Sequence, residues 1–306
     1  MARHFRRSSS QSFKFREASS DLLADFLVNL NKGNKDHLNA LSACSGHFRD
    51  RRIIEYVLLM AKELALDPLA GYQAIELLQR FMVKHLIDLL APQTPPDAAA
   101  DPPVGNVDGI FEKLKEKFPL VIFSCLQLAS KVSLHSQVIS NDAAVCFLRS
   151  VGFSVSKQAL LESELMVLKG LEFRLNVPNP LTYVETLLEV FGHNEPSIAL
   201  DRLHRLCRHV LRFVSLQRTA IFDSLLVTTT QCVSPSREQR DKFVTVTEDF
   251  MLLGVGVIAV ASFILYVRKW EQVVEELSHI TGISRRSITD FAHAALTHIV
   301  RAPVLL

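Results

Sequence analysis

Two long apolar segments, Phe118–Val132 and Phe250–Val267, place the strongest constraint on how this chain can fold. A few polar or small residues and one lysine interrupt the first, and the second has no charged residue in 18 positions (250 to 267). A helix that is apolar on nearly all sides must be surrounded by other helices or by lipid. The second segment reaches the short limit for a membrane span. Because amphipathic patterns continue after it, we expect both segments to be buried core helices.

Apolar residues also recur at helical spacing before and between these segments, and strand patterns are nearly absent. In the first half of the chain, helices are predicted over 20–30, 51–66 and 118–132. Further helices are predicted to start at Pro68, with Asp67 as the N-cap, at Asn141 or Asp142, and at Ser156. The sequence Val-Pro-Asn-Pro at 177–180 then ends helical structure and marks a domain boundary.

The second half repeats this organisation without repeating the sequence. We expect a helix after Pro180, a long helix over 198–226, a polar loop over 228–242, the apolar helix from Phe250, and two shorter helices after Trp270 and Ser284. The two apolar helices begin 132 positions apart (250 − 118), and each is third in a predicted set of five. The predicted fold is therefore all-α, with two tandem five-helix bundles.

The domain boundaries follow from changes in composition. We predict a basic flexible tail over 1–19, an N-terminal helical segment over 20–45, a first bundle over 46–178 and a second over 179–306. Residues 91–109 are rich in Pro, Ala and Asp, and are expected to form a flexible insertion. The tail contains no secretory signal. Its Arg- and Ser-rich composition suits a mitochondrial presequence, a nuclear-import or partner-binding segment, or a simple solvated tail.

The overall charge excludes a strong general attraction to nucleic acid or membrane, because 34 Lys and Arg nearly balance 32 Asp and Glu. The five cysteines are widely spaced, with no Cys-x-x-Cys pair, and are interpreted as free thiols in a reducing compartment; they are Cys44, Cys125, Cys146, Cys207 and Cys232. No metal site and no cofactor are therefore expected.

Catalytic motifs are also missing from the sequence. It contains no nucleophile elbow, P-loop, zinc-protease or kinase signature. Gly254 and Gly256 form a Gly-x-Gly pattern, but they lie inside an apolar helix with no preceding strand, so we do not interpret them as a phosphate-binding turn. We predict a protein that is not an enzyme.

One charged pattern suggests a partner-binding surface. Arg202, Arg205, Arg208 and Arg212 fall on one helix face at i, i+3, i+6 and i+10. Such a stripe could bind phosphates or an acidic protein surface, or it could be an ordinary solvated face. No aromatic residues are interleaved with it, so direct binding of nucleic acid is not expected.

Three stretches of sequence resemble the cyclin box, in the order found in that family. They are YQAIELLQRF (72–81), CLQLASKV (125–132) and LLESELMVLKGLEFRLNVPNP (160–180). The resemblance continues through PLTYVETLLEVFG (180–192) and EDFMLLGVGVIA (248–259), and so covers nearly the whole chain after about residue 20.

The resemblance implies that the chain binds a cyclin-dependent kinase. Cyclins hold the movable αC helix of the kinase inward, so that its glutamate pairs with the ATP-positioning lysine. Their main polar contacts are a lysine that ends helix three and a glutamate in helix five, which correspond here to Lys131 and Glu164. Either residue could instead have a purely structural role, since a cation near a helix C-terminus is favoured by the helix dipole.

Some family features are altered. The Met-Arg-Ala-Ile-Leu motif of helix one matches the stretch from Arg49 to Ile53, and Gln79 falls where the family has an aspartate that pairs with the motif's arginine. Arg52 replaces an apolar groove residue, so substrate docking through that groove is not expected. A divergent branch of the family with similar alterations is associated with meiotic crossover formation in the nucleus.

The sequence and the resemblance together predict a divergent cyclin-like protein. It would bind a cyclin-dependent kinase, recombination and crossover proteins, or both, on meiotic chromosomes in the nucleus, with the cytoplasm as an alternative location. Two alternatives are a kinase-independent scaffold in recombination or repair and a nucleic-acid-binding cyclin fold.

Overall fold

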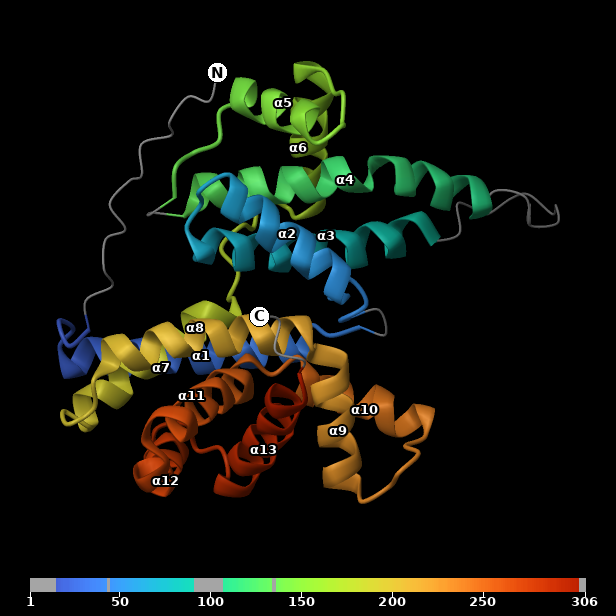
Figure 1. The fold of residues 1–306 in the computed structure, drawn as a ribbon. Coiled ribbons are helices and arrows are strands. Elements are labelled where there is room, and N and C mark those ends of the chain that lie inside the picture. Colours follow the sequence, from blue (N-terminus) through green and yellow to red (C-terminus); the bar gives the residue numbers. More distant parts are fainter. Residues whose placement is uncertain (1–14, 43–44, 91–106, 134–135, 303–306) are drawn as a thin grey trace.

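The computed structural model describes residues 15–42, 45–90, 107–133 and 136–302 of the chain. In these ranges every regular element is a helix (Figure 1), which confirms the all-α class. Residues 1–14 of the predicted tail, Cys44, and residues 91–106 of the predicted insertion lie outside the described ranges. Residues 107–109, also assigned to the insertion, instead form the first turn of a helix.

The first bundle is built around one buried helix, as predicted. Its helices are α2 (Arg51–Glu63), α3 (Pro68–Leu90), α4 (Val107–Val132), α5 (Asn141–Ser150) and α6 (Lys157–Gly170). Every residue of α4 from 121 to 130 is buried, and this helix packs against α3 and α6. The sequence sets the helix starts locally, since the side chains of Asp50, Ser140 and Ser156 accept hydrogen bonds from the first backbone N–H groups of α2, α5 and α6.

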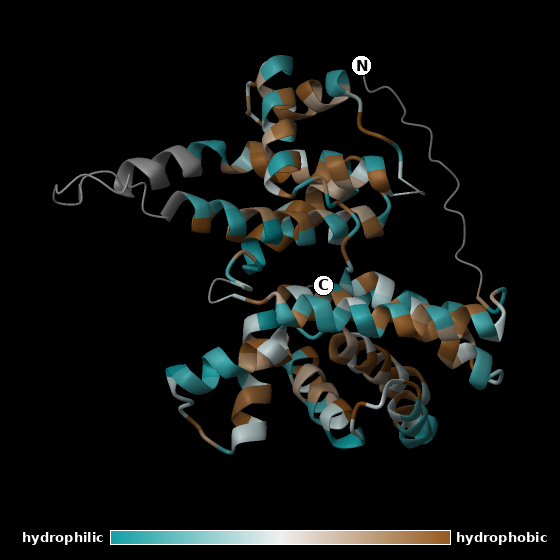
Figure 2. Cartoon of the chain, turned by 180° about the vertical axis from the view of Figure 1, so that it is seen from behind, coloured by the Kyte–Doolittle hydropathy of each residue, from teal (hydrophilic) through white to brown (hydrophobic). Residues whose placement is uncertain are grey.

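The second bundle is built around α11, which is the second apolar segment. Its helices are α7 (Pro180–Asn194), α8 (Leu200–Leu216), α9 (Arg218–Thr230), α10 (Arg237–Thr247), α11 (Phe250–Tyr266), α12 (Trp270–Thr281) and α13 (Arg285–Arg301). Residues 250–262 of α11 are all buried, packed chiefly against α7, α8 and α13. Viewed from behind, the helices of both bundles carry polar residues on their outer sides and apolar residues between them (Figure 2).

Two predictions about the second bundle are wrong in detail. The long helix expected over 198–226 is two helices, because the backbone leaves helical geometry at Gln217 (φ −107°, ψ 18°) and α9 turns to pack against α13. The apolar pattern continues through this break, so periodicity could not reveal it. The loop expected over 228–242 contains the start of α10, where Ser236 and Gln239 form a reciprocal capping box. The five helices predicted for this bundle correspond to α7, to α8 and α9 together, to α11, to α12 and to α13. The helix α10 was not predicted.

Length and composition alone would allow one stretch of the described helices, 250–281, to cross a membrane. In this fold 72% of its most apolar window is buried inside the protein, which is the pattern of a core helix. The two glycines of the Gly-x-Gly pattern explain how α11 packs so closely. A methyl group added at Gly254 would lie 2.9 Å from Leu187, and one added at Gly256 would lie 2.1 Å from the ring of Phe291.

The N-terminal helix α1 (Ser20–Asn39) is longer than the 20–30 segment predicted, and it packs on α7 and α11 of the second bundle. In Figure 1 it lies beside α7 and α8, away from the first bundle. Tyr183 of α7 donates a hydrogen bond to the carbonyl oxygen of Leu30 at 3.1 Å. Asn34, which is buried, donates to Asp249 at 2.9 Å and accepts from the backbone N–H of Phe250 at 3.0 Å.

The residues just before α1 also dock on the second bundle, although the sequence assigned them to the flexible tail. The backbone N–H of Arg16 donates to Glu189 at 2.7 Å. Its guanidinium donates to the carbonyl oxygens of Gly192 at 2.9 Å and of Pro196 and Ile198 at 3.0 Å. These carbonyl groups belong to the end of α7 and the turn after it, where helical partners are missing. The docked N-terminal segment therefore begins within the predicted tail.

Candidate partner-binding site

Lys131 and Glu164, the two residues that correspond to the kinase contacts of cyclins, form an ion pair in the structure. Lys131 lies in the last turn of α4 and Glu164 in the middle of α6. The Lys131 side chain is 38% exposed, whereas that of Glu164 is 7% exposed, so the ammonium group covers the carboxylate from the solvent side. The fold thus brings together two residues 33 positions apart, and their contact with a kinase stays a prediction.

Hydrogen bonds around the end of α4 hold this pair in place. The amide of Gln127 donates to the carbonyl oxygen of Ile139 at 3.2 Å and to Asn141 at 2.8 Å, which fixes the connection from α4 to α5. One turn of α4 before this anchor, Ser124 donates to Ser163 at 2.8 Å, and both hydroxyl groups are buried. Since Ser163 precedes Glu164 in the chain, this bond sets the position of α6 against α4 at the level of the ion pair.

Two exposed leucines flank the pair. Leu161 is 40% exposed and Leu165 is 45% exposed. They stand at i−3 and i+1 relative to Glu164, which places all three on one side of α6. We name the surface formed by Lys131, Leu161, Glu164 and Leu165 the α4–α6 face. It combines an ion pair with apolar area that the chain leaves uncovered, and this combination suits binding to a helix of another protein.

An arginine and a carboxylate also pair between the segment before α2 and α3. Arg49 lies just before α2, and its two terminal nitrogens each donate to one oxygen of Glu76 on α3 at 2.6 Å. Gln79, predicted at the position of the family's aspartate, instead accepts from the backbone N–H of Phe48 at 3.1 Å. The segment before α2 is thus joined to α3 by an ion pair between Arg49 and Glu76, and Gln79 takes no part in it.

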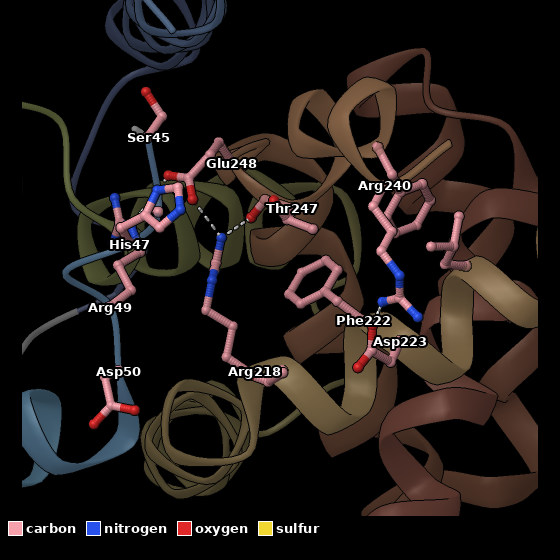
Figure 3. A pocket seen from close by; sticks show the side chains of 14 residues that line it. Ser45, His47, Arg49, Asp50, Arg218, Phe222, Asp223, Arg240, Thr247 and Glu248 are labelled. Atoms are coloured by element: carbon pink, nitrogen blue, oxygen red, sulfur yellow. Dashed lines mark hydrogen bonds and ion pairs between the residues drawn. The ribbon is translucent and has the colours of Figure 1, made fainter. Parts of the chain in front are cut away.

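Arg49 also joins the two bundles, through Glu248 at the end of α10. The Arg49 Nε lies 3.1 Å from Glu248, and Arg218 at the start of α9 donates to the same carboxylate at 2.8 Å (Figure 3). The Glu248 side chain is 2% exposed. His37 of α1 lies 3.7 Å from Glu248 and stacks on Phe250 with 4.6 Å between ring centres. This cluster connects α1, the first bundle and the second bundle.

The charges in this cluster shift the pKa of both Glu248 and Arg49. Burial by itself would raise the pKa of Glu248, but the positive charges of Arg49 and Arg218 outweigh it and hold the pKa well below its usual range. Burial also lowers the pKa of Arg49, and Glu248 and Glu76 more than offset that effect, so the pKa of Arg49 is raised. Both groups are therefore charged at any physiological pH, and the cluster is a fixed inter-bundle connection.

An open pocket of about 350 Å³ lies beside this cluster, between the 45–50 loop, α9 and α10 (Figure 3). Its charged side chains are largely satisfied within the protein, since Arg240 donates to Asp223 at 2.6 Å and Arg218 pairs with Glu248. In the described part of the chain, no group of three His, Cys, Asp or Glu is arranged to hold a metal ion. The pocket is accordingly interpreted as a feature of the bundle junction.

The predicted arginine stripe lies on the outer face of α8. Arg202, Arg205, Arg208 and Arg212 are all exposed. The face of α8 opposite to them, which includes Leu203, Cys207 and Leu211, is buried. The stripe lies on α8, whereas the α4–α6 face lies on two helices of the first bundle.

Comparisons with known proteins agree with this architecture. No protein-family model matches the chain. The chain is 41% identical over 297 residues to cyclin N-terminal domain-containing protein 1 of Homo sapiens, with 97% of this chain and 90% of that protein covered. It is 39% identical over 290 residues to the protein of the same name from Mus musculus, with 95% of this chain and 87% of that protein covered.

The all-α fold of two helical bundles is consistent with a cyclin-like protein, and the two relatives, which are named as cyclin-domain proteins, support this class. With identities of this size over nearly the full length, the chain belongs to the family of cyclin N-terminal domain-containing protein 1.

Proposed function

We propose that this chain is a divergent cyclin that binds a cyclin-dependent kinase through the α4–α6 face and supports the maturation of meiotic crossovers. The observation that carries the proposal is the Lys131–Glu164 ion pair, positioned beside exposed leucines where the cyclin family makes its kinase contacts. The membership of the cyclin N-terminal domain-containing family supports a regulatory protein that acts through protein partners.

The geometry of the face suits this role. The ammonium group of Lys131 has three N–H donors, so it can keep its bond to Glu164 and still donate to backbone carbonyl groups of a partner helix. Leu161 and Leu165 offer apolar area on the same side of α6. A partner helix that buries the leucines would also desolvate the ion pair, which strengthens any hydrogen bond made to it.

The cellular role in this proposal comes from the family resemblance. We propose that the protein acts in the nucleus, on meiotic chromosomes, with recombination and crossover proteins among its partners. The exposed Arg51 and Arg52 begin α2 where typical cyclins carry an apolar docking groove. Under this proposal the protein binds and positions the kinase and does not recruit substrates through that groove.

The test is a charge swap that keeps the internal ion pair but reverses its direction. A variant with Lys131→Glu and Glu164→Lys should lose co-purification with the kinase and the kinase activity recovered with it. The matched control swaps Asp142→Lys and Lys157→Glu, a surface pair of 3.1 Å that joins α5 and α6. Because it leaves the α4–α6 face intact, the control should keep kinase binding.

A second variant tests the same face without changing a buried residue, because substitution of the buried Glu164 can prevent folding. Leu165→Asp places a charge on the exposed apolar part of the face and should also abolish kinase binding. Val300→Asp on α13, where Val300 is 83% exposed, is its control. If both α4–α6 variants fold and bind the kinase like the unchanged protein, the cyclin-type interface is refuted. The protein would then be better described as a kinase-independent scaffold.

A further inference from the structure

We propose that the arginines on the outer face of α8, together with Arg51 at the start of α2, bind an acidic segment of a partner protein. We name this set, which consists of Arg51, Arg202, Arg205, Arg208 and Arg212, the α8 arginine surface. It is separate from the α4–α6 face, so the proposal does not depend on kinase binding.

The arginines are held outward by the strong amphipathic character of α8. The helix buries seven residues against the second bundle, namely Leu200, Leu203, His204, Cys207, Val210, Leu211 and Val214. The four α8 arginines occupy the opposite side, and none can turn inward without displacing that core. From Arg202 to Arg212 the helix rises about 15 Å, so their guanidinium groups form a row of that length.

Among the described residues, these arginines form no ion pair, which distinguishes them from Arg49, Arg218 and Arg240 but not from other exposed arginines such as Arg268. In the described parts of the chain, none of the five forms an ion pair with a carboxylate. By contrast, Arg49, Arg218 and Arg240 are each paired with an acid within 3.1 Å. Like charges three or four residues apart on a helix repel one another and destabilise it slightly. A bound acidic partner would remove this repulsion.

Arg51 belongs to this surface because it lies at the junction where α2 packs against α8. Arg51 and residues 215–220 line a small pocket of about 150 Å³ where α2 packs against the end of α8. At Tyr72 of α3, burial raises the pKa to about 12, although a hydrogen bond with Ser215 and the charges of Arg212 and Arg208 act against this rise. Because α2 of the first bundle packs against α8, helix α8 lies at the junction of the two bundles. In Figure 1, α8 lies on the side of the second bundle that faces the first.

The chemistry of the surface favours an acidic protein segment over a nucleic acid. The formal net charge of the whole chain is only +2, which gives a weak long-range attraction for a polyanion. The exposed residues of α8 include no Phe, Tyr or Trp on which bases could stack, and they do include the acidic Asp201. A single row of guanidinium groups matches carboxylates spaced along one peptide, to which arginine can form paired hydrogen bonds.

Binding can be measured by fluorescence anisotropy with the full chain and three probes. The probes are a fluorescein-labelled glutamate-rich peptide, its glutamine counterpart and a short DNA duplex. The unchanged protein should bind the glutamate peptide, with an affinity that falls as salt is added, and should bind the glutamine peptide and the duplex more weakly. Tighter binding of the duplex would overturn the proposal in favour of a nucleic-acid surface.

Charge-reversal variants show whether the α8 arginine surface is responsible. Arg205→Glu with Arg212→Glu should weaken binding of the glutamate peptide by about tenfold or more. The control, Arg237→Glu with Arg268→Glu, makes the same change in net charge at exposed positions on other elements and should change the affinity by less than about twofold. All four sites are exposed, so both proteins should fold, as circular dichroism would verify.

Two further measurements test whether the α8 arginine surface binds the peptide specifically and separately from the α4–α6 face. The Arg205 and Arg212 reversal should gain affinity for a lysine-rich peptide and should keep kinase co-purification. Equal loss of peptide binding in the control would overturn the proposal, because it would indicate only a general effect of charge. Loss of kinase co-purification in the reversal would overturn the separation of the two surfaces.

Discussion

The buried carboxylate of Glu248 provides a quantitative test of how the two bundles are joined. Glu248→Gln keeps the shape of the side chain but removes the negative charge between Arg49 and Arg218. Arg49 retains both hydrogen bonds to Glu76, whereas Arg218 keeps only the carbonyl oxygen of Thr247. Breaking a buried ion pair from one side costs about 3–5 kcal/mol. Because glutamine still offers an acceptor, we expect a loss near the lower end, about 3 kcal/mol.

The carboxylate of Glu248 should also make the free energy of unfolding depend on pH. The pKa of Glu248 in the folded protein lies well below its usual range, so the unfolded chain takes up a proton at this residue first as the pH falls. Its contribution to stability is therefore fully present above the ordinary glutamate pKa of about 4.3 and decreases below it. The difference between the unchanged protein and Glu248→Gln should be largest near neutral pH and should shrink in acid.

Urea unfolding followed by circular dichroism, repeated at several pH values, measures both effects. Glu238→Gln is the control, because Glu238 is 76% exposed and pairs with the exposed Lys242 one turn away. That change should alter the free energy of unfolding by less than about 0.5 kcal/mol. If Glu248→Gln costs no more than this control at neutral pH, or if its effect grows in acid, the account of the inter-bundle cluster is refuted.

Two other predictions concern the interior of the bundles. Gly256→Ala should destabilise the protein by roughly 1–3 kcal/mol in thermal or urea unfolding, because the new methyl group would overlap the buried ring of Phe291. Gly33→Ala, with its nearest contact at 3.3 Å, should cost less, and equal losses would contradict the packing argument. Among the thiols, burial raises the pKa of Cys125, so it should react with a thiol reagent only on unfolding, whereas the exposed Cys146 should react in the folded protein. Mass spectrometry of labelled peptides would detect the reverse order.

The parts of the fold that could be predicted are those where local sequence and burial agree. The charge-free segment from Phe250 could only be stable inside a protein or a membrane, and the amphipathic helices around it favoured a protein core. Asp67 and Ser156 stand where caps are needed, and in the structure the side chain of each accepts a hydrogen bond from the first turn of its helix. In these cases a few neighbouring residues contain all the information.

Other features depend on residues far apart in the chain and could not be found by periodicity. The second half of α1 looks too polar to be packed, yet Asn34 is buried there because Asp249 and the backbone of Phe250 satisfy its amide. In the cluster around Glu248, this residue pairs with Arg49, which lies 199 positions earlier in the chain (248 − 49), and no local sequence pattern indicates the pair. One available signal was the pair of acids, Glu248 and Asp249, placed directly before a wholly apolar helix. Family resemblance singled out Lys131 and Glu164 as kinase contacts, but their ion pair with each other was not predicted, because neither spacing nor resemblance indicated it.

The docking of α1 on the second bundle has a consequence for the order in which the chain can fold during synthesis. This helix leaves the ribosome first, but its partners α7 and α11 begin 160 (180 − 20) and 230 (250 − 20) residues later. The helices α2 to α6 lie between them and can assemble earlier through contacts between near neighbours. Translation can therefore complete the first bundle before the partners of α1 have been made, and the docking of α1 on α7 and α11 then joins residues that lie far apart in the chain. A chain started at residue 46, which would keep both predicted bundles, would lose that step and leave the second bundle without the helix that covers Tyr183 and Phe250.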